Sequence, residues 1–232
     1  MGDANQLTYV RRHAAEFAAP FLEVGSKDYG NTQDLRSLFA DKDRYLGVDQ
    51  AAGPKVDLVL DLTDDFDAID RALGGMRFGT IFCLSVLEHC RQPFRMADAL
   101  TRLLRPGGKL CVSVPFAFQF HGFPSDYWRF TPEGIKVLFP ALDFDLQQGV
   151  VATSLRNDLQ PLDERLGRIE LGSKAHLRAG RPLRALVAKT FQLLGRAGLL
   201  RWIFGHRCLF PPTCISMIGT RRAEGTPSAQ RL

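Results

Sequence analysis

Three short apolar runs near the start of the chain each end in groups that suit an adenosine ligand. The runs at 21–24, 44–48 and 56–60 are followed, in chain order, by Gly25 with Ser26, by Asp49, and by Asp61 with Leu62. A glycine lets a ligand approach the backbone, and a carboxylate at the spacing of Asp49 can accept both hydroxyls of a ribose. Asp61 beside Leu62 suits the amino group and ring face of adenine. Each residue alone could serve a turn or a helix cap, but the ordered set predicts an adenosine site.

A second set of residues could act as a general base and remove a proton from a bound substrate. The candidates are His89, His121 and Asp126. The ordinary pKa of histidine, about 6.5, suits proton removal near neutral pH. His121 has an alternative role, in which it only hydrogen-bonds the backbone of its loop.

The five residues from Asp126 to Phe130 hold an acid, a base and three aromatic rings. As a binding wall, they would place Tyr127 and Arg129 against a polar acceptor. As a structural plug, Trp128 and Phe130 would be packed and held by an Asp126–Arg129 ion pair. We assign Tyr127 and Arg129 to the substrate and the other two rings to the structure, and we expect no metal ligands.

The elements that must position these residues follow from the hydrophobic pattern. Seven short apolar runs predict strands, at 21–24, 44–48, 56–60, 80–84, 109–114, 143–147 and 214–220. Helix-period segments at 34–40 and 94–104 lie between them, and Arg105-Pro106-Gly107-Gly108 predicts the end of the second helix. Apolar strands alternating with helices are typical of a parallel sheet covered on both faces, whose ligands bind beyond the carboxyl ends of the strands. We therefore expect a doubly wound, mostly parallel, seven-stranded α/β sheet.

Charge divides the chain into two parts. Residues 171–232 hold 11 of the 30 Lys and Arg residues and only Glu224 of the 25 acidic ones, so they carry +10 in a chain whose total is +5. This division predicts two surfaces with different partners. We expect a cofactor-binding α/β domain over 1–150, a basic helical insertion over 151–210, a last strand over 211–221 and a polar tail over 222–232.

The basic insertion has three possible roles. Apolar residues recur at helical spacing over 183–204, with four basic residues between them. The segment could be a lid over the substrate, with its bases in water. It could lie on an anionic membrane through residues 174–207, with Trp202, Ile203 and Phe204 at the lipid boundary. Contact with nucleic-acid phosphates is the third role and the least expected.

Five blocks of the sequence together resemble class I S-adenosylmethionine-dependent methyltransferases. The blocks are Phe21 to Gly30, Tyr45 to Asp49, Val56 to Asp64, Ser85 to His89 and Leu104 to Leu110. The resemblance covers roughly residues 9–140, and the order and spacing of the blocks make it specific. The segments 25–28, 47–54 and 121–134 further resemble small bacterial methyltransferases of mostly unassigned substrate. The resemblance implies a Rossmann-like methyltransferase fold with S-adenosyl-L-methionine as cofactor.

The resemblance also implies roles for single residues. Those implied to bind the cofactor are Glu23, Gly25 and Ser26 near its methionine end, Asp49 with Gln50 at the ribose, Asp61 and Leu62 at the adenine, and Ser85 and His89 after the fourth strand. One departure concerns the first loop, where Lys27 stands in place of the usual second glycine and Gly30 lies one position late. We expect this departure to affect the shape of the loop rather than cofactor binding. The G-x-G-x-x-G pattern of nicotinamide-binding proteins is absent, which argues against a nicotinamide cofactor.

The segment after the fourth strand bears on the acceptor. Enzymes of this superfamily that methylate the amino groups of nucleic-acid bases have a D-P-P-Y or N-P-P-Y element there. This chain has Ser85-Val86-Leu87-Glu88 instead. We therefore expect methylation of a hydroxyl or carboxylate oxygen on a small-molecule, sugar or lipid-linked acceptor. The alternative is a cofactor-binding protein without catalysis, tethered to membrane or RNA through its basic arm.

Composition sets the class of protein. The chain is 45% hydrophobic and 24% charged, as expected for a soluble globular core, and it has no apolar run of about 18 residues that could span a bilayer. Residues 1–20 lack the apolar core of a secretory signal. Five cysteines without a C-x-x-C pair predict buried thiols in a reducing compartment. We expect a cytoplasmic protein, with peripheral contact at the inner face of the membrane as an open alternative.

Overall fold

A computed structural model describes residues 4–30, 34–39, 44–122, 125–153, 159–198 and 206–223. In chain order, the first half contains α1 (Ala4–Arg12), η1 (Ala14–Glu16), β1 (Phe21–Val24), η2 (Arg36–Leu38), β2 (Tyr45–Asp49), β3 (Leu58–Val59), α2 (Phe66–Ala72), β4 (Phe78–Leu84), η4 (Leu87–His89), α3 (Pro93–Leu103) and β5 (Leu104–Ala117). The second half contains α4 (Pro132–Leu138), β6 (Leu142–Phe144), β7 (Val150–Thr153), β8 (Leu159–Pro161), β9 (Ile169–Glu170), α5 (Ser173–Arg178), α6 (Pro182–Arg196), β10 (Cys208–Leu209) and β11 (Thr213–Arg221). The elements labelled η are single 3-10 turns.

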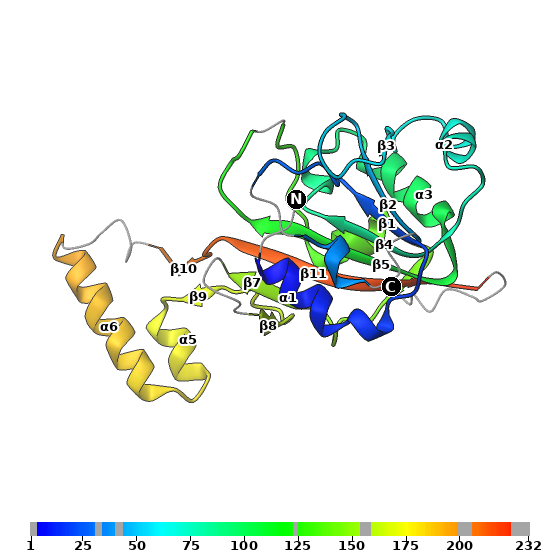
Figure 1. The fold of residues 1–232 in the computed structure, drawn as a ribbon. Coiled ribbons are helices and arrows are strands. Elements are labelled where there is room, and N and C mark those ends of the chain that lie inside the picture. Colours follow the sequence, from blue (N-terminus) through cyan, green and yellow to red (C-terminus); the bar gives the residue numbers. More distant parts are fainter. Residues whose placement is uncertain are drawn as a thin grey trace.

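Nine strands of the described residues form the main sheet, in the order β3-β2-β1-β4-β5-β11-β7-β8, with β6 also paired to β11. β1 is parallel to both of its neighbours, and Val24 lies opposite Val48 of β2 and Cys83 of β4. β11 runs antiparallel between β5 and β7. The carboxyl ends of β1, β2 and β4 therefore meet at one edge of the sheet, where doubly wound folds bind their ligands (Figure 1).

The expected doubly wound sheet is confirmed, but it has two strands more than the seven predicted. All seven predicted runs form strands, and β7 and β8 are added to them. β11 is nine residues long and pairs with two short strands on the same side. β6 lies beside its end near Gly219, and β7 lies beside its start near Thr213. The main sheet thus continues past residue 150, and the helices of the insertion begin at Ser173. The helix predicted over 34–40 is reduced to the single turn η2 in the described residues.

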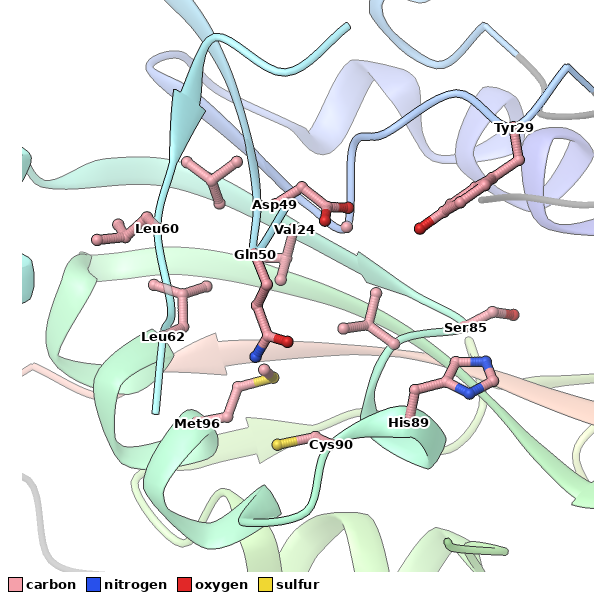
Figure 2. Close-up of a pocket in the computed structure, with 13 residues that line it drawn as sticks. Val24, Tyr29, Asp49, Gln50, Leu60, Leu62, Ser85, His89, Cys90 and Met96 are labelled. Atoms are coloured by element: carbon pink, nitrogen blue, oxygen red, sulfur yellow. The ribbon is translucent and has the colours of Figure 1, made fainter. Parts of the chain in front are cut away.

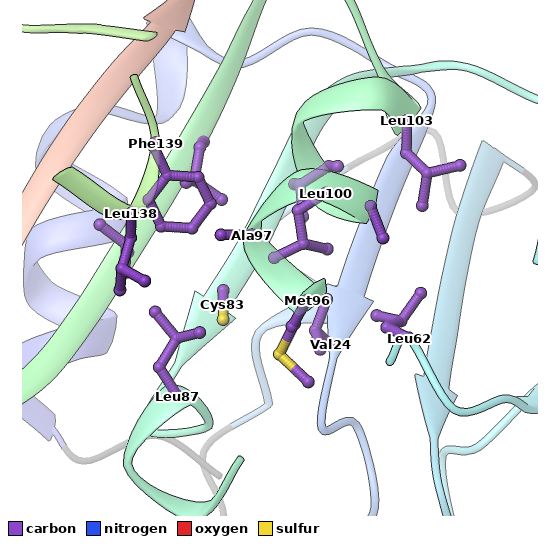
Figure 3. Close-up of a cluster of buried hydrophobic side chains, with 14 of the residues drawn as sticks. Val24, Leu62, Cys83, Leu87, Met96, Ala97, Leu100, Leu103, Leu138 and Phe139 are labelled. Atoms are coloured by element: carbon purple, nitrogen blue, oxygen red, sulfur yellow. The ribbon is translucent and has the colours of Figure 1, made fainter. Parts of the chain in front are cut away.

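Helices cover both faces of the sheet. α3 begins at Pro93, whose fixed φ suits the first helical position. It buries Met96, Ala97, Leu100 and Leu103 at helical spacing against the strands (Figure 3). On the opposite face, α1 packs its own apolar side against aromatic rings of β1, β2 and β4. The strands are therefore apolar on both sides, as their sequences predict.

The helices α5 and α6 pack against each other and stand apart from the main sheet (Figure 1). We call residues 173–198 the basic arm. Its base is closed by an antiparallel pair, in which Glu170 of β9 lies opposite Cys208 of β10. No described helix combines the length and hydropathy that a membrane span requires. The residues predicted to meet lipid, Trp202, Ile203 and Phe204, lie outside the described residues, as does the polar tail from residue 224 onward.

Candidate functional site

A cleft opens at the carboxyl ends of β1, β2 and β4 (Figure 2). Its open space, solvent-filled mouth included, is about 670 Å³. Six predicted cofactor residues line it, namely Gly25, Asp49, Gln50, Leu62, Ser85 and His89. Figure 2 shows Leu60, Leu62, Cys90 and Met96 gathered at one end and Ser85 with His89 at the other. The cleft thus has an apolar end and a polar end, with Asp49 between them.

Gly25 forms the turn that leaves β1. Its φ is +71°, in the left-handed region that glycine adopts without strain. A Cβ added at this position would lie 2.7 Å from Cγ2 of Val86, which also lines the cleft. The backbone of the turn and the segment after β4 therefore approach each other as closely as a glycine permits.

Asp49 ends β2 and holds its carboxylate beside the cleft. Oδ1 accepts a hydrogen bond from the backbone N–H of Ala51 at 3.0 Å, and Oδ2 accepts one from that of Lys27 at 3.3 Å. Each carboxylate oxygen has about two acceptor sites, so each can accept one more hydrogen bond. The side chain is oriented by the backbone and remains able to bind two hydroxyl groups.

Three of the residues implied as cofactor ligands do not line the cleft. Glu23 points to the other face of β1, where Oε2 accepts a hydrogen bond from the Tyr45 hydroxyl at 2.9 Å. Burial raises the pKa of Glu23 more than this hydrogen bond lowers it. Ser26 is buried, and its hydroxyl has no hydrogen-bond partner among the described residues.

Asp61 is the third of these residues and closes a turn. Its Oδ1 accepts hydrogen bonds from the backbone N–H and the hydroxyl of Thr63, at 2.8 and 2.7 Å. Burial acts to raise the pKa of Asp61, but these hydrogen bonds outweigh it and leave the pKa lowered. Leu62, the next residue in this turn, faces the cleft in its place.

Ser85 is held from the N-terminal helix. The Gln6 amide donates to the Ser85 hydroxyl at 2.7 Å and to the Ser113 hydroxyl at 3.0 Å. Gln6 is buried, and Ser85 has a φ of +54°. α1 therefore acts at the polar end of the cleft from the far face of the sheet, which the sequence alone does not indicate.

The turn η4 places Glu88 and His89 at the polar end. His89 contacts the backbone carbonyl of Ser125 through Nδ1, while its Nε2 is buried and unpartnered among the described residues. Burial lowers the pKa of His89, and the Ser125 contact opposes this only in part. Glu88 is 1% exposed, and burial raises its pKa to about 7.

His121 and Asp126 are brought together by their loop. The backbone N–H of His121 donates to Oδ2 of Asp126 at 3.0 Å, and Nδ1 lies 3.2 Å from the same oxygen. Arg129 donates to Oδ2 through Nη2 at 2.7 Å and holds the pKa of Asp126 well below its usual range. Asp126 is thus an ionised group that orients His121, and it is not a proton acceptor near neutral pH.

The run from Asp126 to Phe130 makes both packing contacts and exposed contacts. Trp128 donates from Nε1 to the Cys90 carbonyl at 2.8 Å, and Phe130 is buried. Tyr127 is 45% exposed and lies under the Arg91 guanidinium. Arg129 also donates to the backbone carbonyls of Phe118 and Gln119, so its guanidinium holds the loop rather than facing the cleft.

Comparison with solved structures finds methyltransferases among the chains that share this fold. The N-methyltransferase NodS of Bradyrhizobium japonicum WM9, solved in complex with S-adenosyl-L-homocysteine, matches with a TM-score of 0.52 at 12% identity, covering 94% of this chain and 86% of that chain. A 1,6-didemethyltoxoflavin-N1-methyltransferase of Burkholderia thailandensis, with bound 1,6-didemethyltoxoflavin and S-adenosylhomocysteine, gives 0.52 at 13%, covering 95% and 79%. A candidate methyltransferase of Bacillus halodurans C-125 gives 0.53 at 10%, covering 95% and 100%. No protein-family model and no curated protein matches the sequence.

Proposed function

Because the chain has the fold of class I S-adenosylmethionine-dependent methyltransferases, we propose that it transfers a methyl group from S-adenosyl-L-methionine to an oxygen of a small-molecule, sugar or lipid-linked acceptor. The observation that carries this proposal is the cleft in which Gly25, Asp49 and Leu62 lie together. The sequence presents these residues after three separate strands, and the sheet brings them to one cavity.

The cleft fits the parts of this cofactor. Leu60, Leu62 and Met96 provide an apolar wall for the adenine. Both oxygens of Asp49 can accept hydroxyls of the ribose, and Gly25 leaves the backbone open to the amino-acid end. When bound, the cofactor supplies a methyl group on a positively charged sulfur, so positioning of the acceptor provides much of the catalysis.

The acceptor end is proposed to lie beside Ser85 and His89. An oxygen acceptor must lose a proton, and two imidazoles lie at this end, with ring centroids of His89 and His121 5.0 Å apart. We assign both histidines to the acceptor oxygen and Asp126 to the orientation of His121. The exposed ring of Tyr127 is assigned to the acceptor wall. Oxygen is favoured over nitrogen because Ser85-Val86-Leu87-Glu88 follows β4 where a D-P-P-Y element would otherwise stand.

The basic arm supports a lipid-linked acceptor. It leaves the sheet at the same edge as the cleft, because β11 is antiparallel to β5 and Thr213 lies opposite Ala117. α6 leaves Leu183, Leu186 and Val187 exposed, and no acidic residue occurs between 171 and 223. Exposed apolar side chains interspersed with bases are typical of a helix on anionic lipid. A helix closed over the sheet as a lid would bury these side chains, so we favour membrane contact over the lid.

Calorimetry with S-adenosyl-L-homocysteine tests the cofactor site. Wild type is expected to bind it, and Asp49→Ala to bind it at least about tenfold more weakly, a difference of about 1.4 kcal/mol. Asp98→Ala is the matched control, because Asp98 is an exposed carboxylate of α3 outside the cleft. Absence of binding by wild type, or equal affinity of Asp49→Ala and wild type, contradicts the proposal.

A turnover assay with pooled acceptors tests the chemistry. Hydroxyl, carboxylate and amine acceptors are incubated separately with S-adenosyl-L-methionine, and release of S-adenosyl-L-homocysteine is measured. Turnover with the hydroxyl or carboxylate pool is expected. Turnover confined to amines would show that the acceptor atom is nitrogen and not oxygen. Binding of S-adenosyl-L-homocysteine without any turnover would favour the non-catalytic alternative.

A further inference from the structure

Glu88, His89 and His121 form a cluster at the polar end of the cleft, which we call the histidine–glutamate cluster. One ligand atom from each residue, a ring nitrogen of each histidine and a carboxylate oxygen of Glu88, lies within 4.8 Å of the other two. Two histidines and one carboxylate are the ligands of many open zinc sites and of other divalent transition-metal sites. The sequence does not indicate such a site, because the two histidines are far apart along the chain.

Both imidazoles are held in the same tautomer. Nδ1 of His89 contacts the Ser125 carbonyl, which can only accept, so Nδ1 carries the proton and Nε2 keeps its lone pair. Nδ1 of His121 lies 3.2 Å from an Asp126 oxygen and 3.3 Å from the Gln119 carbonyl, which are also acceptors. Histidines that bind metals usually donate their second ring N–H to a carbonyl or a carboxylate in this way.

Two atoms of the cluster lack a partner. Oε2 of Glu88 and Nε2 of His89 are buried, and neither has a hydrogen-bond partner among the described residues. An unpaired buried polar group destabilises the fold, because its lost contact with water is not replaced. With Glu88 ionised, both atoms offer lone pairs, so a ligand that carries positive charge or donates hydrogen bonds would satisfy them.

We propose that Glu88, His89 and His121 bind one divalent transition-metal ion, with Zn²⁺ as the representative ion. Ligands of a tetrahedral zinc lie about 3.4 Å apart, given zinc–nitrogen bonds of about 2.0–2.1 Å. His121, whose side chain is 32% exposed, can turn to close the wider spacing of the free cluster. His89 lines the cleft, so the ion has an open position on the acceptor side.

The ion has a use in the proposed reaction. Coordination to a divalent cation lowers the pKa of a bound hydroxyl, so an acceptor oxygen on the ion would release its proton to water near neutral pH. With the ion bound, His89 and His121 act as its ligands and not as bases. This role depends on the proposed methyl transfer, whereas the binding of the ion does not.

Calorimetric titration with Zn²⁺, Co²⁺ and Mn²⁺, with the bound metal counted by elemental analysis, tests the site. Wild type is expected to bind one ion per chain. His89→Ala, His121→Ala and the isosteric Glu88→Gln are each expected to bind it at least about tenfold more weakly. His206→Ala is the matched control, because His206 is an exposed histidine outside the cluster, and its metal affinity should equal that of wild type. Absence of binding for all three ions, or equal affinity of His121→Ala and wild type, overturns the site.

Titration of the same proteins with S-adenosyl-L-homocysteine separates the two proposals. His121 does not line the cofactor cleft, so His121→Ala should bind S-adenosyl-L-homocysteine as wild type does, which also shows that it is folded. Loss of Zn²⁺ affinity in that folded variant supports the metal site. Wild type that binds S-adenosyl-L-homocysteine but no metal overturns the metal site alone, and wild type that binds metal but no S-adenosyl-L-homocysteine overturns the methyltransferase proposal alone.

Discussion

Gly25 combines two constraints at one residue, a left-handed φ and contact with Val86. Gly25→Ala would introduce a Cβ 2.7 Å from Cγ2 of Val86 at a φ of +71°. We expect the strained backbone to lower the free energy of unfolding by about 1–3 kcal/mol. Movement of the turn is expected to weaken binding of S-adenosyl-L-homocysteine at least about tenfold. Urea denaturation and calorimetry measure the two effects.

Gly30→Ala is the matched control for this substitution. Gly30 has a φ of +86°, but an added Cβ would have nothing within 4 Å. The control shares the backbone strain and lacks the contact, so it should lose stability while keeping its affinity for S-adenosyl-L-homocysteine. Equal losses of affinity in both variants would show that the contact with Val86 does not shape the cleft.

Glu23 gives a prediction on pH. Burial raises its pKa above the ordinary value of 4.5, while the Tyr45 hydroxyl and the charges of Arg36 and Lys55 act in the opposite direction. The folded state therefore holds the proton more tightly than the unfolded chain. The stability that this contributes is present below the ordinary pKa and is lost as the pH rises through the raised pKa of the folded state.

Glu23→Gln imitates the protonated form, and its amide oxygen can still accept from Tyr45. We expect urea midpoints of the variant and wild type to be similar at pH 4, and the variant to gain relative to wild type as the pH rises to 8. A relative loss at pH 8 would show that the ionised carboxylate stabilises the fold.

The sequence predicts several site residues that directly follow strands, although Ser26 and Asp61 also follow strands and do not line the cleft. It misses the residues that depend on a distant loop. Gly25, Asp49 and Leu62 belong to the first kind, because strand ends meet wherever parallel strands pair. Glu88 belongs to the second, since its burial depends on the loop whose Tyr127 backbone donates to the Glu88 carbonyl. The contact of Gln6 with Ser85 also joins distant segments, and no local pattern indicates it.

At the scale of elements, strong periodicity and clear boundaries made prediction accurate. β1 and α3 lie within a residue of their predicted bounds, because an apolar run and a Pro–Gly stop delimit them. The sequence does not indicate β7 and β8, because they are only four and three residues long and β7 depends on pairing with the distant β11. The predicted helix over 183–204 is confirmed as far as Arg196 in the described residues.

The proposed membrane contact depends on the exposed apolar side chains of α6. Leu183 and Leu186 are 78% and 63% exposed, so Leu183→Ser with Leu186→Ser should leave stability within about 0.5 kcal/mol of wild type. The double variant is expected to lose flotation with anionic phosphatidylglycerol vesicles, because the apolar side chains no longer enter the interface.

Phe94→Ser is the control, since it removes an apolar side chain that is 62% exposed on α3, away from the arm. It should float as wild type does. Membrane contact through α6 would be contradicted if wild type remained at the bottom of the gradient, or if the double variant and the control floated equally.

At the scale of the whole molecule, the described segments on either side of the basic arm pair with each other. β9 precedes the arm and β10 follows it, and next to this pair the Leu171 N–H donates to the Arg207 carbonyl at 3.2 Å. Replacement of residues 172–206 by a short Gly-Ser loop should therefore preserve the sheet. We expect cooperative unfolding and affinity for S-adenosyl-L-homocysteine to persist and vesicle binding to be lost.

The same deletion tests the lid alternative. A lid that completes the cleft would reduce the affinity for S-adenosyl-L-homocysteine when it is removed from a protein that still folds. Retained affinity with lost vesicle binding would instead assign the arm to the membrane.

The position of β11 between β5 and β7 sets the order in which a growing chain can complete its core. During synthesis on the ribosome, β5 cannot pair with β11 until the whole arm has been made, because β11 follows the arm in sequence. Nascent chains would therefore display the apolar face of α6 before the sheet is closed. The arm could meet a chaperone or a bilayer surface while the methyltransferase fold is still incomplete.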